Sequence, residues 1–143
     1  MDFDEDDDEL DLFVEAQDSV WTDVILELKR GKKESHWMWF VFPQLAELGQ
    51  SDMSQLYGLA DLEEASAYYD RKILRERLDT AAQLILAHDG KSAKDIMGRV
   101  DSMKLRSSAT LFAAVPGAAP HYQAILDRFY DGKPCPDTVA AIA

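Results

Sequence analysis

The sequence predicts an all-α fold: a single-domain, irregular array of about seven to nine short helices around a central aromatic helix. Apolar residues recur at helical spacing along nearly the whole chain. Glycine, proline and capping residues interrupt that pattern at short intervals, which favours many short helices over a bundle of long ones. No stretch alternates apolar and polar residues as a half-buried strand does. With 143 residues and 47% hydrophobic content, the chain matches one ordinary domain with a core.

The N-terminal residues 1–9 are predicted to be an acidic disordered tail, and residues 10–143 to be the single helical domain. Seven of the first nine residues are acidic, and they carry seven of the twelve units of net negative charge. Such a composition buries too little apolar surface to offset the entropy of ordering. The alternative interpretation is an acidic arm that binds a partner.

Two helical segments are predicted ahead of residue 31. The apolar spacing from Leu10 to Val14 indicates the first. Asp18 is predicted to cap the second, which runs to Arg30 and ends at Gly31, where glycine adopts a left-handed conformation at low cost.

The most distinctive segment is short and aromatic. Ser35 is predicted to cap a helix from His36 to Phe42, which Pro43 ends or kinks. Because this helix is apolar on all sides, we expect it at the centre of the core.

The remaining helices are predicted from capping residues, glycine and proline. They are a short segment over 54–59, a helix from Asp61 to about Tyr69, the clearest helix from Asp70 to Gly90, a short turn over 93–97, a helix that Asp101 caps and Pro116 ends, a helix from Pro120 to Gly132, and a last short helix after Pro136.

Composition argues against several function classes. The net charge of −12 opposes binding to a phosphate backbone, so no nucleic-acid partner is expected. The longest apolar run, Trp37 to Phe42, is far shorter than the roughly 20 residues of a membrane span. The single Cys135 excludes an intramolecular disulfide and no signal segment is recognised, so a cytoplasmic protein is expected. Cys135, between two prolines, is predicted to be inert.

Two segments stand out as candidates for chemistry. The first, Lys32 to Gln44, reads Lys-Lys-Glu-Ser-His-Trp-Met-Trp-Phe-Val-Phe-Pro-Gln, and the second, Asp101 to Phe112, reads Asp-Ser-Met-Lys-Leu-Arg-Ser-Ser-Ala-Thr-Leu-Phe. They resemble the Ser-His-Trp-Met-Trp-Phe-x-Phe-Pro-Gln and Lys-x-x-Ser-Ser-x-Thr-Leu-Phe motifs of the uncharacterised bacterial DUF-1810 family, some members of which are labelled calpastatin. We call them the first and second signature segments.

The resemblance extends from Leu10 to the C-terminus. It implies a compact all-helical fold and brings with it no established activity. Ala109 departs from the family pattern, in which a larger apolar residue is usual, and this implies a small difference in packing.

The first signature segment supplies five candidate ligand-binding residues: Lys33, His36, Trp37, Trp39 and Gln44. His36 is a weak candidate for a general acid or base, and the alternative is a hydrogen-bonded structural residue. The tryptophans are candidates to stack on a ligand and Gln44 to bind its polar group, or else they belong to the core. No second ligand lies at a metal-binding spacing from His36, and neither a metal nor a cofactor is predicted.

The second signature segment supplies the other five: Lys104, Arg106, Ser107, Ser108 and Thr110. Cations and hydroxyls near the start of a helix are typical of a phosphate or carboxylate site. The alternative is that the cations pair with surface carboxylates and the hydroxyls bond to their own helix.

Three functions follow from these candidates. The first is a helical binding module with a pocket for a small anionic ligand, phosphorylated or nucleotide-like. The second is an enzyme that uses His36 as acid or base in the same pocket. The third is a non-catalytic interaction module for a protein partner or a homodimer.

Overall fold

The computed structural model describes residues 5–143, with side chains from Leu10 onward. Its helices are α1 (Glu5–Arg30), α2 (Met38–Val41), the 3-10 helix η1 (Ala46–Leu48), α3 (Asp52–Tyr57), α4 (Leu62–Asp70), α5 (Lys72–Leu86), α6 (Ala93–Met97), α7 (Arg99–Ala113), α8 (His121–Phe129) and α9 (Pro136–Ile142). Within this range there is no strand, only one isolated bridge between Leu45 and Leu59. The predicted all-α single domain is confirmed.

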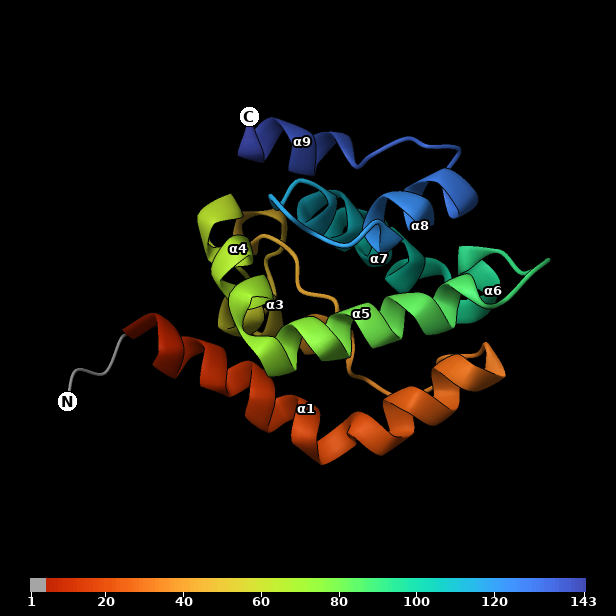
Figure 1. Cartoon of the computed structure of the whole chain (residues 1–143), viewed down its shortest axis with the longest axis horizontal. Coiled ribbons are helices and arrows are strands. Elements are labelled where there is room, and N and C mark those ends of the chain that lie inside the picture. The colour runs from red at the N-terminus through yellow and green to blue at the C-terminus, as the bar shows by residue number, and fades with distance from the viewer. Residues whose placement is uncertain (1–4) are drawn as a thin grey trace.

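The helices lie in successive layers (Figure 1). Helix α5 runs through the middle, with α1 along one side of it and α7 and α8 on the other, and α9 lies beyond α7. The predicted acidic tail falls partly on residues 1–4, which are outside the described residues, and α1 already begins at Glu5. None of the helices in the described range is long and apolar enough to cross a membrane.

Helix α1 is one long helix, so the predicted break at Asp18 was wrong. Gln17 is buried, and its side-chain amide donates to the Phe40 carbonyl at 2.7 Å and to the Tyr68 hydroxyl at 3.0 Å. Asp18 is exposed and forms an ion pair with Arg77 of α5 at 2.6 Å in place of a cap. The polar residues that suggested a break therefore attach a continuous helix to its neighbours.

Capping residues predicted the other helix starts with mixed success. Asp61 accepts from the backbone of the helix that it starts, and Ser92 and Asp95 form a reciprocal capping box, as predicted. The helix start predicted at Asp70 and the cap predicted at Asp101 were wrong. Asp70 is the last residue of α4, and α5 begins at Lys72. Asp101 lies in the first turn of α7, where it pairs with lysines.

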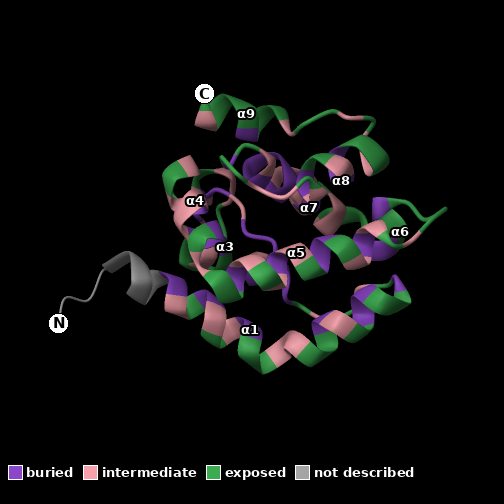
Figure 2. Ribbon diagram, in the orientation of Figure 1, coloured by how far each residue is buried: buried purple, intermediate pink, exposed green. Residues whose placement is uncertain are grey.

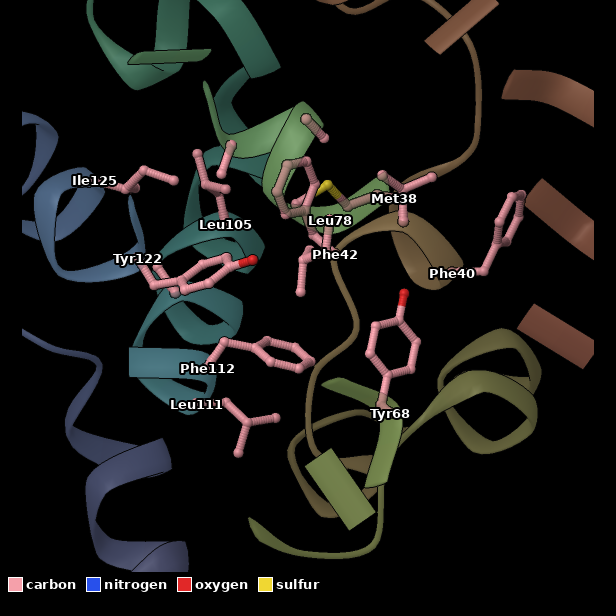
Figure 3. Packing of buried hydrophobic residues seen from close by; sticks show 14 of the residues in the cluster. Met38, Phe40, Phe42, Tyr68, Leu78, Leu105, Leu111, Phe112, Tyr122 and Ile125 are labelled. Carbon is pink, nitrogen blue, oxygen red and sulfur yellow. The ribbon is translucent and has the colours of Figure 1, made fainter. Parts of the chain in front are cut away.

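The aromatic segment is central, but it is less helical than predicted. Trp37 is completely buried, and the helix itself is the single turn of α2, whose first residues have no side-chain cap. The predicted cap at Ser35 was wrong, because the Ser35 hydroxyl donates to Glu27 of α1. Figure 3 shows Met38, Phe40 and Phe42 among side chains of α4, α5, α7 and α8.

Phe112 of α7 is the centre of an aromatic cluster on the other side of this core. Its ring centroid lies 5.5 Å from that of Tyr68, 6.4 Å from Tyr69 and 5.8 Å from Tyr122. The hydroxyls of Tyr69 and Tyr122 both donate to Asp79 of α5, so the polar ends of two buried rings share one acceptor. Burial and the bond to Asp79 raise the pKa of Tyr122, which keeps this hydroxyl a donor.

Burial is unevenly distributed over the helices (Figure 2). Buried residues follow the inward faces of α5 and α7, whereas α9 is largely exposed and has Thr138 as its buried residue. The peripheral position of α9 leaves room between it, α7 and the chain around α3.

Candidate functional site

The structure has a half-open pocket of about 660 Å³ on the α9 side of α7. One wall comes from Trp39 and from the chain between Gln44 and Gly58, a second from the first two turns of α7, and a third from Tyr130 and residues 135–137. Its volume lies within the range of pockets that hold small molecules.

Gly58 brings two parts of the first wall into direct backbone contact. A Cβ atom at this position would collide with the Ser54 carbonyl oxygen and with the Ala46 Cα atom. Just beyond it, the Leu59 N–H donates to the Gln44 carbonyl at 2.8 Å. This close approach holds the chain after Pro43 against α3 and shapes the pocket there.

The two signature segments meet at Asp101. Its carboxylate lies 2.7 Å from the ammonium of Lys33 and 3.4 Å from that of Lys104. Lys104 also lies over the Trp39 ring, 3.7 Å from the centroid, and Lys33 lies 4.8 Å from the centroid of a Trp37 ring. The three charged groups carry a net charge of one positive unit, and the two cation–π contacts join them to the aromatic segment.

The pocket brings together five of the ten candidate ligand-binding residues: Trp39, Gln44, Lys104, Arg106 and Ser107. They come from both signature segments.

The other five candidates lie away from the pocket surface. Trp37, Ser108 and Thr110 are buried, and the side chain of Lys33 is 6% exposed beneath Asp101. The Thr110 hydroxyl donates to the Arg106 carbonyl at 2.8 Å, a bond within its own helix. His36 is exposed and is not among the residues that line the pocket, so the acid–base hypothesis has no support from its position.

Arg106 is held in the pocket wall by backbone carbonyls. Its Nε donates to the Lys133 carbonyl and its Nη2 to the Pro134 carbonyl, both at 2.9 Å. Among the described residues, no carboxylate lies within ion-pair distance of the guanidinium group. The two carbonyls hold the group in one orientation, and within this part of the chain its charge has no anionic partner.

Glu27 of α1 fixes the loop that leads into the first signature segment. Its carboxylate accepts from the Glu34 N–H at 2.6 Å, the Ser35 N–H at 2.8 Å, the Ser35 hydroxyl at 2.5 Å and the Trp37 indole N–H at 3.1 Å. Burial on its own would raise the pKa of Glu27, but these hydrogen bonds lower it to about 2. No sequence pattern pointed to this role, because the spacing of seven to ten residues matches no helical contact.

Cys135 was also missed as a pocket residue. It lies directly before α9 and lines the pocket. The Ser107 hydroxyl donates to Sγ at 3.3 Å, and the Cys135 backbone N–H donates to the Thr110 hydroxyl at 2.9 Å. The one signal in the sequence was the Pro-Cys-Pro turn, which presents a side chain in a rigid backbone. No group of His, Cys, Asp and Glu suited to a metal ion occurs in the part of the chain that the structure describes.

A comparison with known proteins agrees with this architecture. The model of the DUF1810 family, described as a protein of unknown function, matches residues 7–142. The chain belongs to the DUF1810 family. This DUF1810 protein is also similar to the crystal structure of the conserved hypothetical protein Rv1873 from Mycobacterium tuberculosis, with 42% identity and a TM-score of 0.92. That match covers 94% of this chain and 96% of the Rv1873 chain. No curated protein matches the DUF1810 chain.

Proposed function

We propose that this DUF1810 protein is a small binding module whose pocket takes a small anionic ligand, phosphorylated or nucleotide-like. The observation that carries the proposal is Arg106, a pocket-lining cation without a carboxylate partner among the described residues, in a chain of net charge −12. A buried or half-buried charge is costly unless it is paired, and an anion in the pocket supplies the missing partner.

The geometry of Arg106 suits this role. Because two carbonyls already orient the guanidinium group, little side-chain entropy is lost when it binds an anion. Nη1 has no hydrogen-bond acceptor among the described residues and is available to a ligand oxygen. Lys104 adds a second positive charge to the pocket, whereas the carboxylate of Asp137 on the third wall offsets one of the two. The net positive charge of the pocket is therefore small, which favours a ligand with few negative charges.

The rest of the lining supports a ligand with a flat or apolar body. Trp39, Tyr57 and Tyr130 contribute aromatic surface, and Leu45 and Met103 contribute aliphatic surface. Aromatic side chains stack on planar groups and bury large areas at low entropic cost. A nucleotide-like molecule combines such a group with a phosphate, which is why we prefer that class.

A protein-interaction module is the second candidate function. The side chains of Val100 and Met103 at the pocket are 64% and 69% exposed, which is high for apolar residues. They are equally consistent with the rim of a small-molecule pocket. Light scattering that shows a stable dimer, together with no response to any small anion, would favour this second candidate.

Arg106→Gln is expected to weaken binding of adenosine monophosphate at least about tenfold, because a hydrogen bond to a charged group contributes about 1.5 to 3 kcal/mol. Thermal denaturation with a nucleotide titration measures this. A ligand at about 100 times its dissociation constant adds about 2.7 kcal/mol to the native state. Adenosine and inorganic phosphate, each half of the probe, should bind more weakly than the whole.

Lys72→Gln is the matched control for the loss of one positive charge. Lys72 lies on α5 with its side chain 79% exposed, and it does not line the pocket. We expect the same nucleotide response as in the unaltered chain. Equal weakening by both substitutions would mean that net charge alone, and not the pocket, attracts the anion.

A further inference from the structure

We propose that Cys135 is a nucleophilic thiol of this pocket, which exchanges with a small disulfide that enters it and so becomes covalently modified. The inference rests on the proposed function, in that the same pocket admits the reactant. It adds a reactive atom to a site proposed for reversible binding.

A hydroxyl group on the facing helix donates to Sγ and favours its charged form. The Ser107 hydroxyl, on the facing helix α7, lies 3.3 Å from Sγ and 3.4 Å from the Met103 carbonyl, and its single proton can point to either. The backbone N–H groups of Asp137 and Thr138, in the first turn of α9, lower the pKa of the thiol as well. A thiolate is a stronger acceptor than a thiol, so these donors stabilise the reactive form.

The side chain of Thr138 is a second polar group near the sulfur. It is completely buried, and its hydroxyl has no hydrogen-bond partner among the described residues. A buried hydroxyl without a partner destabilises the folded state. This hydroxyl lies near enough to Cys135 to act on its ionisation. A negative charge on Sγ, rather than the neutral thiol, gives it an acceptor.

The ionisation of Cys135 is shifted in the same direction. Burial on its own would raise the pKa of the thiol, but the hydrogen bond from Ser107 and the nearby polar groups of Thr138 and Asp137 lower it below its usual value. Because Cys135 lines the pocket and is only partly buried, a small molecule in the pocket comes close to its side chain. Accessibility and a low pKa together are what distinguish reactive cysteines from inert ones.

The exchange balances without a further reagent. The Cys135 thiolate attacks one sulfur of a disulfide R–S–S–R, a new bond forms between Sγ and that sulfur, and the original S–S bond breaks. The released R–S⁻ takes a proton from solvent. The Cys135 sulfur is oxidised and the leaving thiol is reduced. Because the chain has one cysteine, no internal thiol reverses the step, and an external thiol does so by the same reaction.

A disulfide that carries carboxylates fits the pocket best, because Arg106 and Lys104 then attract it. Glutathione disulfide is such a probe, and bis(2-hydroxyethyl) disulfide is a neutral one. The rate with the neutral probe reports on the thiol alone. The ratio of the two rates reports on the attraction of the charged probe by Arg106 and Lys104. A thiol that is not reactive and a pocket that does not bind anions therefore give different results.

The test measures the rate of Cys135 modification against pH by intact mass spectrometry of the full chain, with the neutral disulfide. The midpoint of this profile should lie below that of the same chain unfolded in urea. Ser107→Ala and Thr138→Val should each raise the midpoint, by about one unit if a charged hydrogen bond is lost. In Arg106→Gln, the rate with glutathione disulfide should fall relative to the rate with the neutral disulfide. The midpoint of the pH profile with the neutral disulfide should still lie below that of the chain in urea.

Ser19→Ala is the matched control. Ser19 is exposed on α1, does not line the pocket, and its hydroxyl donates to the Ala16 carbonyl at 2.8 Å. Its midpoint should equal that of the unaltered chain. A native midpoint at or above the value in urea, or equal midpoints in all three serine and threonine variants, would overturn the proposal.

Discussion

Glu27→Ala is expected to lower the free energy of unfolding by about 3 kcal/mol, because it leaves buried donors without an acceptor. The Trp37 indole N–H is completely buried, and the Glu34 and Ser35 N–H groups lose the same partner. Residues 34–37 then lose their bonds to α1, although the Lys33 N–H still donates to the Ile96 carbonyl at 2.7 Å. Urea denaturation at neutral pH measures the loss.

Glu34→Ala is the control for this substitution. The Glu34 side chain is 58% exposed and pairs only with Arg30 one turn earlier, so its loss should change stability by less than about 0.5 kcal/mol. Equal effects of the two substitutions would contradict the role given to Glu27.

The pH dependence of stability tests the same carboxylate. The folded pKa of about 2 lies below the ordinary value of 4.5. The stabilisation by Glu27 is therefore complete above pH 4.5 and is lost as the pH falls toward 2. Between those values, the stability difference between the unaltered chain and Glu27→Gln should shrink by about 2 to 3 kcal/mol. A difference that stays constant over this range would mean that the carboxylate is not bonded as described.

Phe112→Ala is expected to lower the free energy of unfolding by about 3 to 5 kcal/mol, the usual range for loss of a fully buried aromatic ring. Phe112 is completely buried, and its ring contacts those of Tyr68, Tyr69 and Tyr122. Removing it opens a cavity beside the two tyrosines that share Asp79. Urea denaturation measures this loss as well.

Phe129→Ala provides the comparison for the core substitution. Phe129 is only partly buried at the end of α8, so its replacement should cost much less. Similar losses at the two positions would place the centre of the core elsewhere.

Most helices could be predicted from the sequence because their signals are local. Apolar spacing and the caps at Asp61 and Ser92 act over one or two turns, and both helices form where predicted. The failures come from distant contacts. Asp18 looked like a helix cap, yet its carboxylate pairs with Arg77, which is 59 positions away in the sequence. Ser35 looked like a cap, but Glu27 of another helix takes its hydroxyl.

The sequence predicted which two segments contribute to the pocket, and helix geometry explains why some of their residues do not line it. Successive residues of a helix point about 100 degrees apart, so Ser107 and Ser108 do not share a wall. Ser107 lines the pocket together with Lys104, three positions earlier, whereas Ser108 is buried. Cys135 could not be assigned in this way, because its neighbour Ser107 is 28 residues away in the sequence. Sequence patterns indicate which residues lie close together within one helix, whereas the pocket depends on how α7 and α9 pack against each other.

The indole N–H signals of the protein in NMR spectra offer the most direct test of the pocket. The chain has three tryptophans. Trp39 lines the pocket, Trp37 is buried against Glu27, and Trp21 lies on α1 beside Arg77. On titration with adenosine monophosphate, we predict a saturable shift of the Trp39 signal, little change for the other two, and a much weaker response in Arg106→Gln. A nucleotide that leaves the Trp39 signal unchanged, or shifts only Trp21, would contradict the proposed binding site.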